Sequence, residues 1–273
     1  MVVGDAAPKP RLWLRIVVPI LVLLLFFAIV ESIVRIVDAD THFQNRFFVL
    51  NRALDYPSII KKDHDLFWRL RPNREEASRF YEGKTYRINN LGLRGDNIGG
   101  KTKPRIVALG NSCTFGWGVD DNQAFPAVLE EKLDRSYEVI NAGVPGYSSY
   151  QGRVFFEQEL VDLDPDVVLI MFSWNDIWAA AGEIADKDQE FPPPIVIAIQ
   201  NQLSRLHTYR LLKKLLLTPV EPPTDSLFSH EAPVYRVSRD DFAANLTAIC
   251  STARANDCTP VLMTAPIAST QLY

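Results

Sequence analysis

Three groups of small and polar residues follow apolar stretches of the sequence, and they hold the side chains best suited to catalysis. The first group contains Ser112, the second Gly146 and the third Asn175. A serine at a tight turn exposes its hydroxyl as a nucleophile. The backbone N–H groups of Ser112 and Gly146 and the side-chain amide of Asn175 are donors suited to a developing oxyanion, and losing one such donor typically costs about 10²–10³ in rate. These three residues are the predicted catalytic set.

The stretches around these groups predict a parallel sheet with helices on both faces. Short continuous apolar runs are typical of strands that are buried on both sides. Helical patterns separate the runs, and this alternation is typical of an α/β fold. In an open parallel sheet, ligands bind beyond the carboxyl ends of the strands, so we expect the three groups to meet there. The expected strands are 106–109, 137–144, 166–172 and 259–264, and the expected helices are 123–135, 150–162 and one that opens at the capping residue Ser238.

The ordered blocks resemble those of the SGNH hydrolases, also called the GDSL family. The blocks are Gly110-Asn111-Ser112, a glycine after the second strand, and Asn175-Asp176 after the third. The resemblance implies a flavodoxin-like three-layer α/β/α fold and cleavage or transfer of acyl esters. It implies Ser112 as nucleophile and Gly146 and Asn175 in the oxyanion hole. No cofactor is implied, and no Cys/His cluster has metal-ligand spacing.

The sequence departs from the family pattern in two places. The first block reads Gly-Asn-Ser where the family has Gly-Asp-Ser, but the middle residue is not the nucleophile. The family also places its base in a late Asp-x-x-His block, and this sequence contains no such block. The expectation is that the base, a further helix and a fifth strand lie beyond the end of this chain. The four histidines are His42, His64, His207 and His230, and none stands where the family has its base.

Other interpretations of these residues stay open at this point. The same site would serve an O-acyltransferase that acts on cell-surface polysaccharide, with an acyl acceptor other than water. A truncated or non-catalytic domain would instead bind carbohydrate or a partner protein. Ser112 is also suited to cap a helix, Asn175 to cap the segment after its strand, and Gly146 to form a turn.

The N-terminal region predicts a membrane anchor. Residues 16–30 contain no charge, and apolar flanks extend the stretch. Fifteen helical residues span only about 22 Å, so the flanks must help to cross a core of roughly 30 Å. A cleaved signal peptide is the alternative. The predicted boundaries are a cytoplasmic N-terminus (1–11), the anchor (12–34), a β-containing lead-in (35–104) and the α/β domain (105–273) with an insertion (177–237).

Charges on either side of the anchor predict its orientation. Lys9, Arg11 and Arg15 precede the apolar stretch, and Asp38 and Asp40 follow it. The excess of cations before the stretch places the N-terminus in the cytoplasm and the main domain outside. The expected partners are the membrane and, as the resemblance implies, an acyl-ester substrate, for which acylated carbohydrate is one candidate. The net charge of −4 and the lack of a long basic run argue against nucleic acid.

Two further expectations concern the insertion and the cysteines. The insertion is expected to contain one helix, 197–217, with a basic side. This helix suits a lid, an anionic membrane surface or simple packing on the domain. Cys113 is expected to be buried. Cys250 and Cys258 suit either a disulfide or, as the favoured interpretation, two small buried apolar residues.

In the lead-in, strands are expected at 67–70 and 85–88, with a turn at 90–95.

Overall fold

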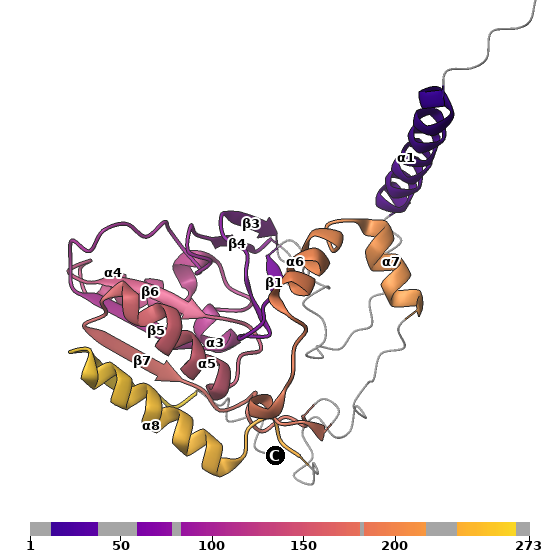
Figure 1. Cartoon of the computed structure of the whole chain (residues 1–273). Coiled ribbons are helices and arrows are strands. Elements are labelled where there is room, and N and C mark those ends of the chain that lie inside the picture. Colours follow the sequence, from indigo (N-terminus) through magenta and orange to yellow (C-terminus); the bar gives the residue numbers. More distant parts are fainter. Residues whose placement is uncertain (1–11, 38–58, 78–82, 181–182, 217–233, 266–273) are drawn as a thin grey trace, which may run out of the picture. The chain divides into compact units, whose positions relative to one another are not determined.

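The computed structural model describes residues 12–37, 59–77, 83–180, 183–216 and 234–265. The chain divides into two compact units. We call residues 1–47 and 202–218 the helical unit, and residues 48–201 and 219–273 the sheet unit. Each is described by itself below, and the labels follow Figure 1.

The sheet unit is built on four parallel strands, as predicted. The strands are β5 (Arg105–Gly110), β6 (Glu138–Gly143), β7 (Val167–Met171) and β8 (Thr259–Leu262). They lie in the order β6-β5-β7-β8. The first strand of the sheet thus has the second and third as its two neighbours, which is the flavodoxin-like doubly wound order. Every residue of β5 is buried, as its apolar run predicted for a central strand.

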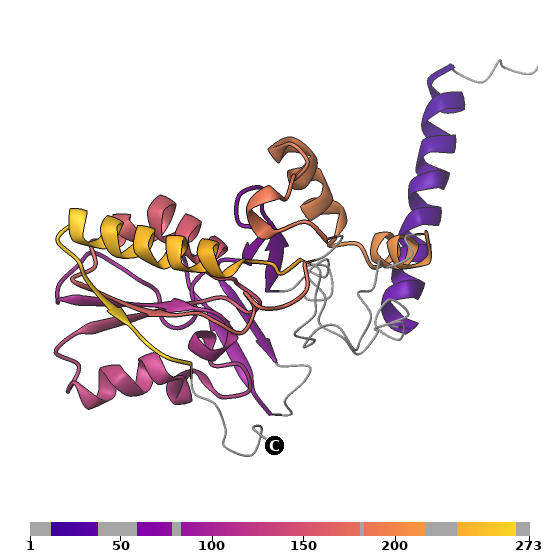
Figure 2. The same ribbon diagram turned by 90° about the horizontal axis from the view of Figure 1, so that it is seen from below.

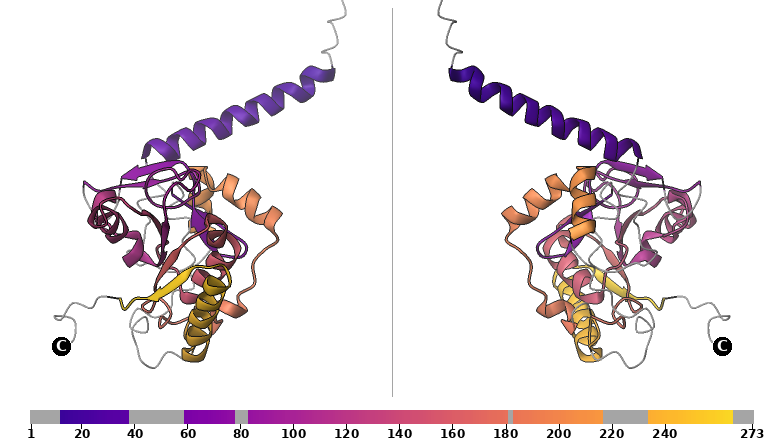
Figure 3. Two further views of the ribbon diagram at one scale, coloured as in Figure 1. Left: turned by 90° about the vertical axis from the view of Figure 1, so that its left-hand side faces the viewer. Right: turned by 90° about the vertical axis from the view of Figure 1, so that its right-hand side faces the viewer.

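Helices cover both faces of this sheet (Figure 2). The helices α5 (Ser149–Phe155) and α8 (Arg239–Ala255) pack together on one face, and α4 (Phe125–Lys132) lies on the other. Ser238 caps α8 as predicted, because its hydroxyl accepts the N–H of Asp241 at 3.1 Å. The helix α8 leads into β8 and runs beside it (Figure 3).

The predicted helix boundaries differ from those of the structure near two of these helices. The helix expected at 123–135 is shorter, because a 3₁₀ turn at Asp121–Gln123 precedes α4 and Asp134 and Arg135 take positive φ values. Helical structure beyond α5 continues as a π segment, Phe156–Leu160, and a 3₁₀ turn, Val161–Leu163. These 3₁₀ and π segments are only three to five residues long, which is too short for the apolar spacing to reveal the helix type.

The lead-in forms two antiparallel hairpins. Strand β1 (Ile60–Lys62) pairs with β2 (Trp68–Leu70), and β3 (Arg74–Ala77) pairs with β4 (Thr85–Ile88). The strands β2 and β4 were predicted, whereas β1 and β3 were not. The reason is clear for β3, whose sequence Arg-Glu-Glu-Ala lacks the alternation that marks a half-buried strand.

The helical unit contains α1 (Leu12–Val37) and α7 (His207–Leu216), which pack against each other. Residues 15–37 of α1 form one helix that is long and apolar enough to cross a membrane. Its 23 residues span about 34 Å, which exceeds a hydrocarbon core of roughly 30 Å.

The single helix predicted at 197–217 was wrong. The structure has two helices, α6 (Pro194–Leu203) and α7, with a turn between them. In this turn Arg205 and Leu206 donate their N–H groups to the carbonyls of Gln202 and Leu203. The apolar residues keep helical spacing across the turn, so the pattern does not reveal the break.

Candidate active site

Ser112 lies at the turn between β5 and a single helical turn, α3 (Ser112–Phe115). Asn111 is the N-cap residue, and its side chain accepts the N–H of Cys113 at 3.0 Å. The capping role expected as one alternative for Ser112 therefore belongs to Asn111. The Ser112 side chain is partly exposed and makes no hydrogen bond to any described residue. Its hydroxyl is thus available to a substrate or to a base.

The turn that carries Ser112 packs tightly onto the sheet. A Cβ at Gly110 would lie 2.1 Å from Oγ1 of Thr114 and 2.6 Å from the carbonyl oxygen of Met171, so only glycine fits there. Cys113 was expected to be buried, and this prediction was wrong because its side chain is exposed. Cys258 is buried and Cys250 is half-buried, and both are free thiols, as the favoured interpretation held.

Gly146 lies in a tight turn after β6. The N–H of Tyr147 donates to the carbonyl of Val144 at 3.2 Å, and Gly146 has φ +84°. Proline at the second position of a turn and glycine with positive φ at the third are typical of a type II turn. A Cβ at Gly146 would lie 2.9 Å from Cζ2 of Trp68, so the indole ring packs directly against this turn.

Hydrogen bonds fix this turn on several sides. The indole N–H of Trp68 donates to the carbonyl of Pro145 at 3.0 Å, and the hydroxyl of Tyr147 donates to the carbonyl of Trp68 at 2.6 Å. Burial raises the pKa of Tyr147 well above its ordinary value, so this hydroxyl stays a donor. The lead-in hairpin β1–β2 thereby holds the predicted oxyanion glycine.

A buried ion pair from the insertion supports the same turn. The guanidinium of Arg236 donates to the carbonyl of Gly146 at 2.8 Å, to both carboxylate oxygens of Asp186 at 3.1 and 2.8 Å, and to Oε1 of Gln151 at 2.8 Å. The side chains of Arg236 and Asp186 are only 0% and 4% exposed. Asp186 also accepts the hydroxyl of Ser148 at 2.6 Å. Sequence reasoning missed this pair, because neither residue belongs to a recognisable motif.

Asn175 reaches from the end of β7 to the end of β6. It is buried, and its Nδ2 donates to the carbonyl of Tyr147 at 2.8 Å. An asparagine amide carries two hydrogens, so one N–H remains for a substrate. The neighbouring Asp176 accepts the N–H of Ser149 at 2.7 Å, while its Oδ2 is buried without a hydrogen-bond partner among the described residues. Burial raises the pKa of Asp176 to about 6.

The structure places the three predicted site residues at one edge of the sheet. Gly110 of β5 is in register with Gly143 of β6 and Met171 of β7, so the three strands end side by side. Ser112, Gly146 and Asn175 each follow one of these ends. Among the described residues, no acceptor takes the backbone N–H of Ser112 or of Gly146. Backbone donors and a partly exposed hydroxyl at one edge of the sheet are groups that acyl transfer uses.

Of the four histidines, the structure describes His64 and His207. His64 is exposed, and its Nδ1 lies 3.1 Å from the carbonyl oxygen of Pro192. His207 is the first residue of α7 in the helical unit. His42 and His230 lie outside the described residues. Within these same limits, no group of three or more His, Cys, Asp or Glu side chains is arranged to hold a metal ion.

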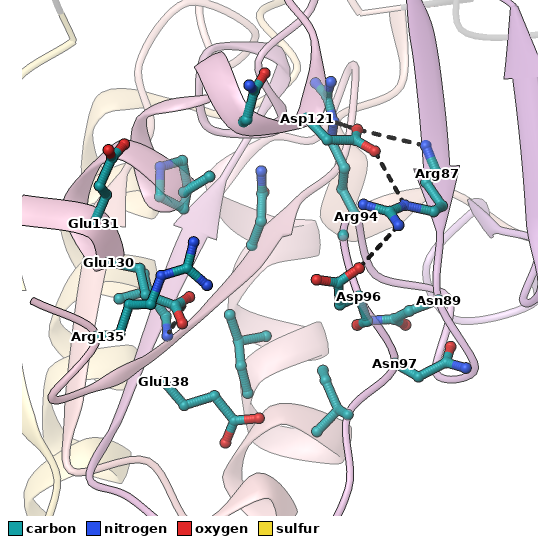
Figure 4. Close-up of a pocket in the computed structure, with 18 residues that line it drawn as sticks. Arg87, Asn89, Arg94, Asp96, Asn97, Asp121, Glu130, Glu131, Arg135 and Glu138 are labelled. Carbon is teal, nitrogen blue, oxygen red and sulfur yellow. Dashed lines mark hydrogen bonds and ion pairs between the residues drawn. The ribbon is translucent and has the colours of Figure 1, made fainter.

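A pocket of about 290 Å³ lies elsewhere, between the end of the lead-in and α4 (Figure 4). Its charges are largely paired within the protein. Arg94 donates to Asp121 at 2.8 Å, and Arg87 contacts Asp96 at 3.0 Å. Arg94 also donates to the carbonyls of Phe115 and Gly116 at 2.7 and 2.6 Å, so it holds the chain just after α3. Arg94, which lines this pocket, therefore supports the turn that carries Ser112.

Comparisons with known proteins identify the family of this chain. The family model of the GDSL-like lipase/acylhydrolase family matches residues 108–272, and the chain belongs to that family. The family and its fold are those that the resemblance implied. A search of the curated proteins found no match.

Solved structures of low similarity include three of this class. A protein of the G-D-S-L family from Desulfitobacterium hafniense DCB-2 shares 18% identity with a TM-score of 0.37, over 62% of this chain and 64% of that one. The psychrotrophic esterase EstA from Pseudoalteromonas sp. shares 17% identity with a TM-score of 0.35, over 60% of this chain and 62% of its own. AlinE4, an SGNH-hydrolase family esterase, shares 18% identity with a TM-score of 0.29, over 59% of this chain and 76% of its own. The chain thus spans less than two thirds of the first two structures.

Proposed function

We propose that this protein is a membrane-anchored serine esterase whose α/β domain lies outside the cytoplasm. The observation that carries the proposal is the position of Ser112, Gly146 and Asn175 after the ends of three adjacent strands, with two backbone N–H groups that donate to no described residue. Membership of the GDSL-like lipase/acylhydrolase family supports ester bonds as the target.

The proposed reaction passes through an acyl-enzyme. The Oγ of Ser112 adds to the ester carbonyl carbon, and its proton passes to a base. The negative oxygen is held by the N–H groups of Ser112 and Gly146 and by the amide of Asn175. The bond to the alcohol oxygen then breaks, and the alcohol leaves with a proton. Water attacks the acyl-serine, releases the acid and restores the hydroxyl. We assign no residue as the base, because the sequence contains no Asp-x-x-His block.

The location rests on the N-terminal helix. Residues 15–37 are long and apolar enough to span a bilayer, and the cations Lys9, Arg11 and Arg15 lie at its start. Cations are enriched on the cytoplasmic side of such helices. The chain after α1 is therefore proposed to be extracytoplasmic, which gives the site access to acylated molecules of the cell surface, such as acylated carbohydrate.

Covalent labelling tests the nucleophile directly. The full-length protein in detergent is treated with a fluorophosphonate, and the labelled peptide is identified by mass spectrometry. We expect the label on Ser112 and its loss in Ser112→Ala, together with loss of hydrolysis of an activated acetyl ester. Ser136→Ala is the matched control, because the Ser136 hydroxyl is exposed and donates only to the carbonyl of Leu133.

The same assay distinguishes the remaining alternatives. Addition of a polysaccharide acceptor separates hydrolysis, which yields free acid, from transfer, which yields acylated sugar. A folded protein that neither reacts with the fluorophosphonate nor cleaves the ester would contradict the proposal and favour a binding module.

A further inference from the structure

The N-terminus of α7 is bound by a carboxylate of α1. Oε1 of Glu31 accepts the N–H of His207 at 3.0 Å, and Oε2 accepts the N–H of Thr208 at 2.9 Å and its hydroxyl at 2.8 Å. The first N–H groups of a helix have no partner within the helix, and the helix dipole favours an anion there. Glu31 thus caps α7 from a different helix. Figure 1 shows α7 beside α1.

The position of Glu31 in α1 sets the level at which α7 starts. Glu31 follows directly on the uncharged residues 16–30 and stands six residues before the end of α1 at Val37. Six helical residues correspond to about 9 Å. If α1 spans a membrane, Glu31 lies about 9 Å before the outer end of the helix, which places it near the outer boundary of the hydrocarbon. A carboxylate is costly there unless it is paired, and α7 supplies three hydrogen bonds to it.

The sequence of α7 separates apolar from basic positions. With 100° per residue, Leu211, Leu212, Leu215 and Leu216 fall within roughly 140° of the helix circumference. Leu212, Leu215 and Leu216 are 51%, 63% and 76% exposed. Residues 205–216 contain four basic and no acidic residues, and one of the four, Arg210, is buried and donates to the carbonyl of Ser204. Exposed leucines beside cations are typical of helices that lie in a membrane interface.

We infer that α7 lies in the outer interface of the membrane that α1 spans, and that its partner is a surface of anionic lipid. The leucines enter the boundary of the acyl chains, and the exposed Arg205 and the half-buried Lys213 lie at the level of the phosphate groups. This inference rests on the membrane anchoring proposed above. It adds a second contact with the bilayer, which restrains the chain that follows α1.

Spin labels placed singly on the full-length protein test this arrangement. The native cysteines are first replaced (Cys113→Ala, Cys250→Ala and Cys258→Ala), and thermal unfolding verifies that background. One label is introduced by Leu212→Cys or Leu216→Cys on the apolar face. Lys213→Cys is the matched control on the other face. The protein is reconstituted into vesicles of phosphatidylcholine with one quarter phosphatidylglycerol.

The readout is accessibility to oxygen, which concentrates in lipid, against a water-soluble nickel chelate. We expect oxygen to be favoured at positions 212 and 216 by several-fold over position 213, and the difference to shrink without phosphatidylglycerol. Glu31→Ala is expected to weaken the pattern, because α7 loses its cap. A label introduced by Leu23→Cys in α1 reports separately whether α1 spans the bilayer.

Two outcomes would overturn the inference while the anchor stands. With Leu23→Cys in lipid, access of the nickel chelate to every α7 label would place the helix in water. Shielding of positions 212 and 216 from both reagents would show a protein contact instead, such as a second copy of this chain. A water-exposed label at position 23 would contradict the anchor itself, and the α7 inference would fall with it.

Discussion

The buried ion pair Arg236–Asp186 belongs to the insertion, and through Arg236 it supports the turn at Gly146. We therefore expect the insertion to be needed for the stability and activity of the site. Replacement of Arg236 by methionine removes the donor to the carbonyl of Gly146 and leaves the carboxylate of Asp186 buried without its cation. The two side chains are 0% and 4% exposed, so water cannot replace the lost partner without rearrangement.

The size of the effect follows from this burial. Loss of one member of a buried ion pair typically costs about 3–5 kcal/mol, because an uncompensated charge remains. For a domain of this size about 1 kcal/mol corresponds to 2–4 °C in Tm, so Arg236→Met is expected to lower Tm by about 10 °C. The double variant Arg236→Met/Asp186→Asn leaves no charge at these two positions, and it is expected to lose clearly less than the sum of the two single variants.

Thermal unfolding of the full-length protein in detergent measures these shifts, and activity on an activated ester is followed in parallel. Lys187→Met is the matched control, since Lys187 pairs with Asp241 in a contact with side chains 50% and 29% exposed. Such an exposed pair is worth at most about 1 kcal/mol. The reasoning would be refuted if the Tm losses of the two single variants added up to that of the double variant. It would also be refuted if Arg236→Met lowered Tm by as little as Lys187→Met does.

Two further predictions concern residues after β7. Asn175→Ala is expected to lower kcat for ester hydrolysis by about 10²–10³ with little change in KM, because it removes a transition-state donor. Asn245→Ala is the control, because Asn245 is similarly buried but lies outside the site. An unchanged kcat in Asn175→Ala would exclude Asn175 from the oxyanion hole. The pKa of Asp176, raised from 3.8 to about 6, means that the folded state holds this proton more tightly, so the free energy of unfolding falls by up to about 3 kcal/mol as pH rises from 4 to 6. Asp176→Asn should lack this fall when Tm is measured against pH, and an identical pH slope would contradict it.

Much of the sheet could be predicted from local pattern. The apolar runs around β5, β6, β7 and β8 predict strands because buried parallel strands carry continuous apolar sequence. The capping residue Ser238 marks the start of α8 for an equally local reason. Boundaries were less certain where helix types change, and β3 was missed because its side chains do not alternate.

The sequence by itself determined the residues that follow each strand, Ser112, Gly146 and Asn175, and with them the family and a set of candidate donors. Only the tertiary structure decided that Asn111 takes the capping role and leaves the Ser112 hydroxyl unbonded. It also decided that Arg236 supports the turn at Gly146, and that Glu31 caps α7. The physical reason for the last two is distance along the chain: periodicity and caps act over a few residues, whereas these two hydrogen bonds join residues 90 and 176 positions apart. The cap at Asn111 is local, but Asn111 and Ser112 are both good capping residues, so the backbone geometry decides between them.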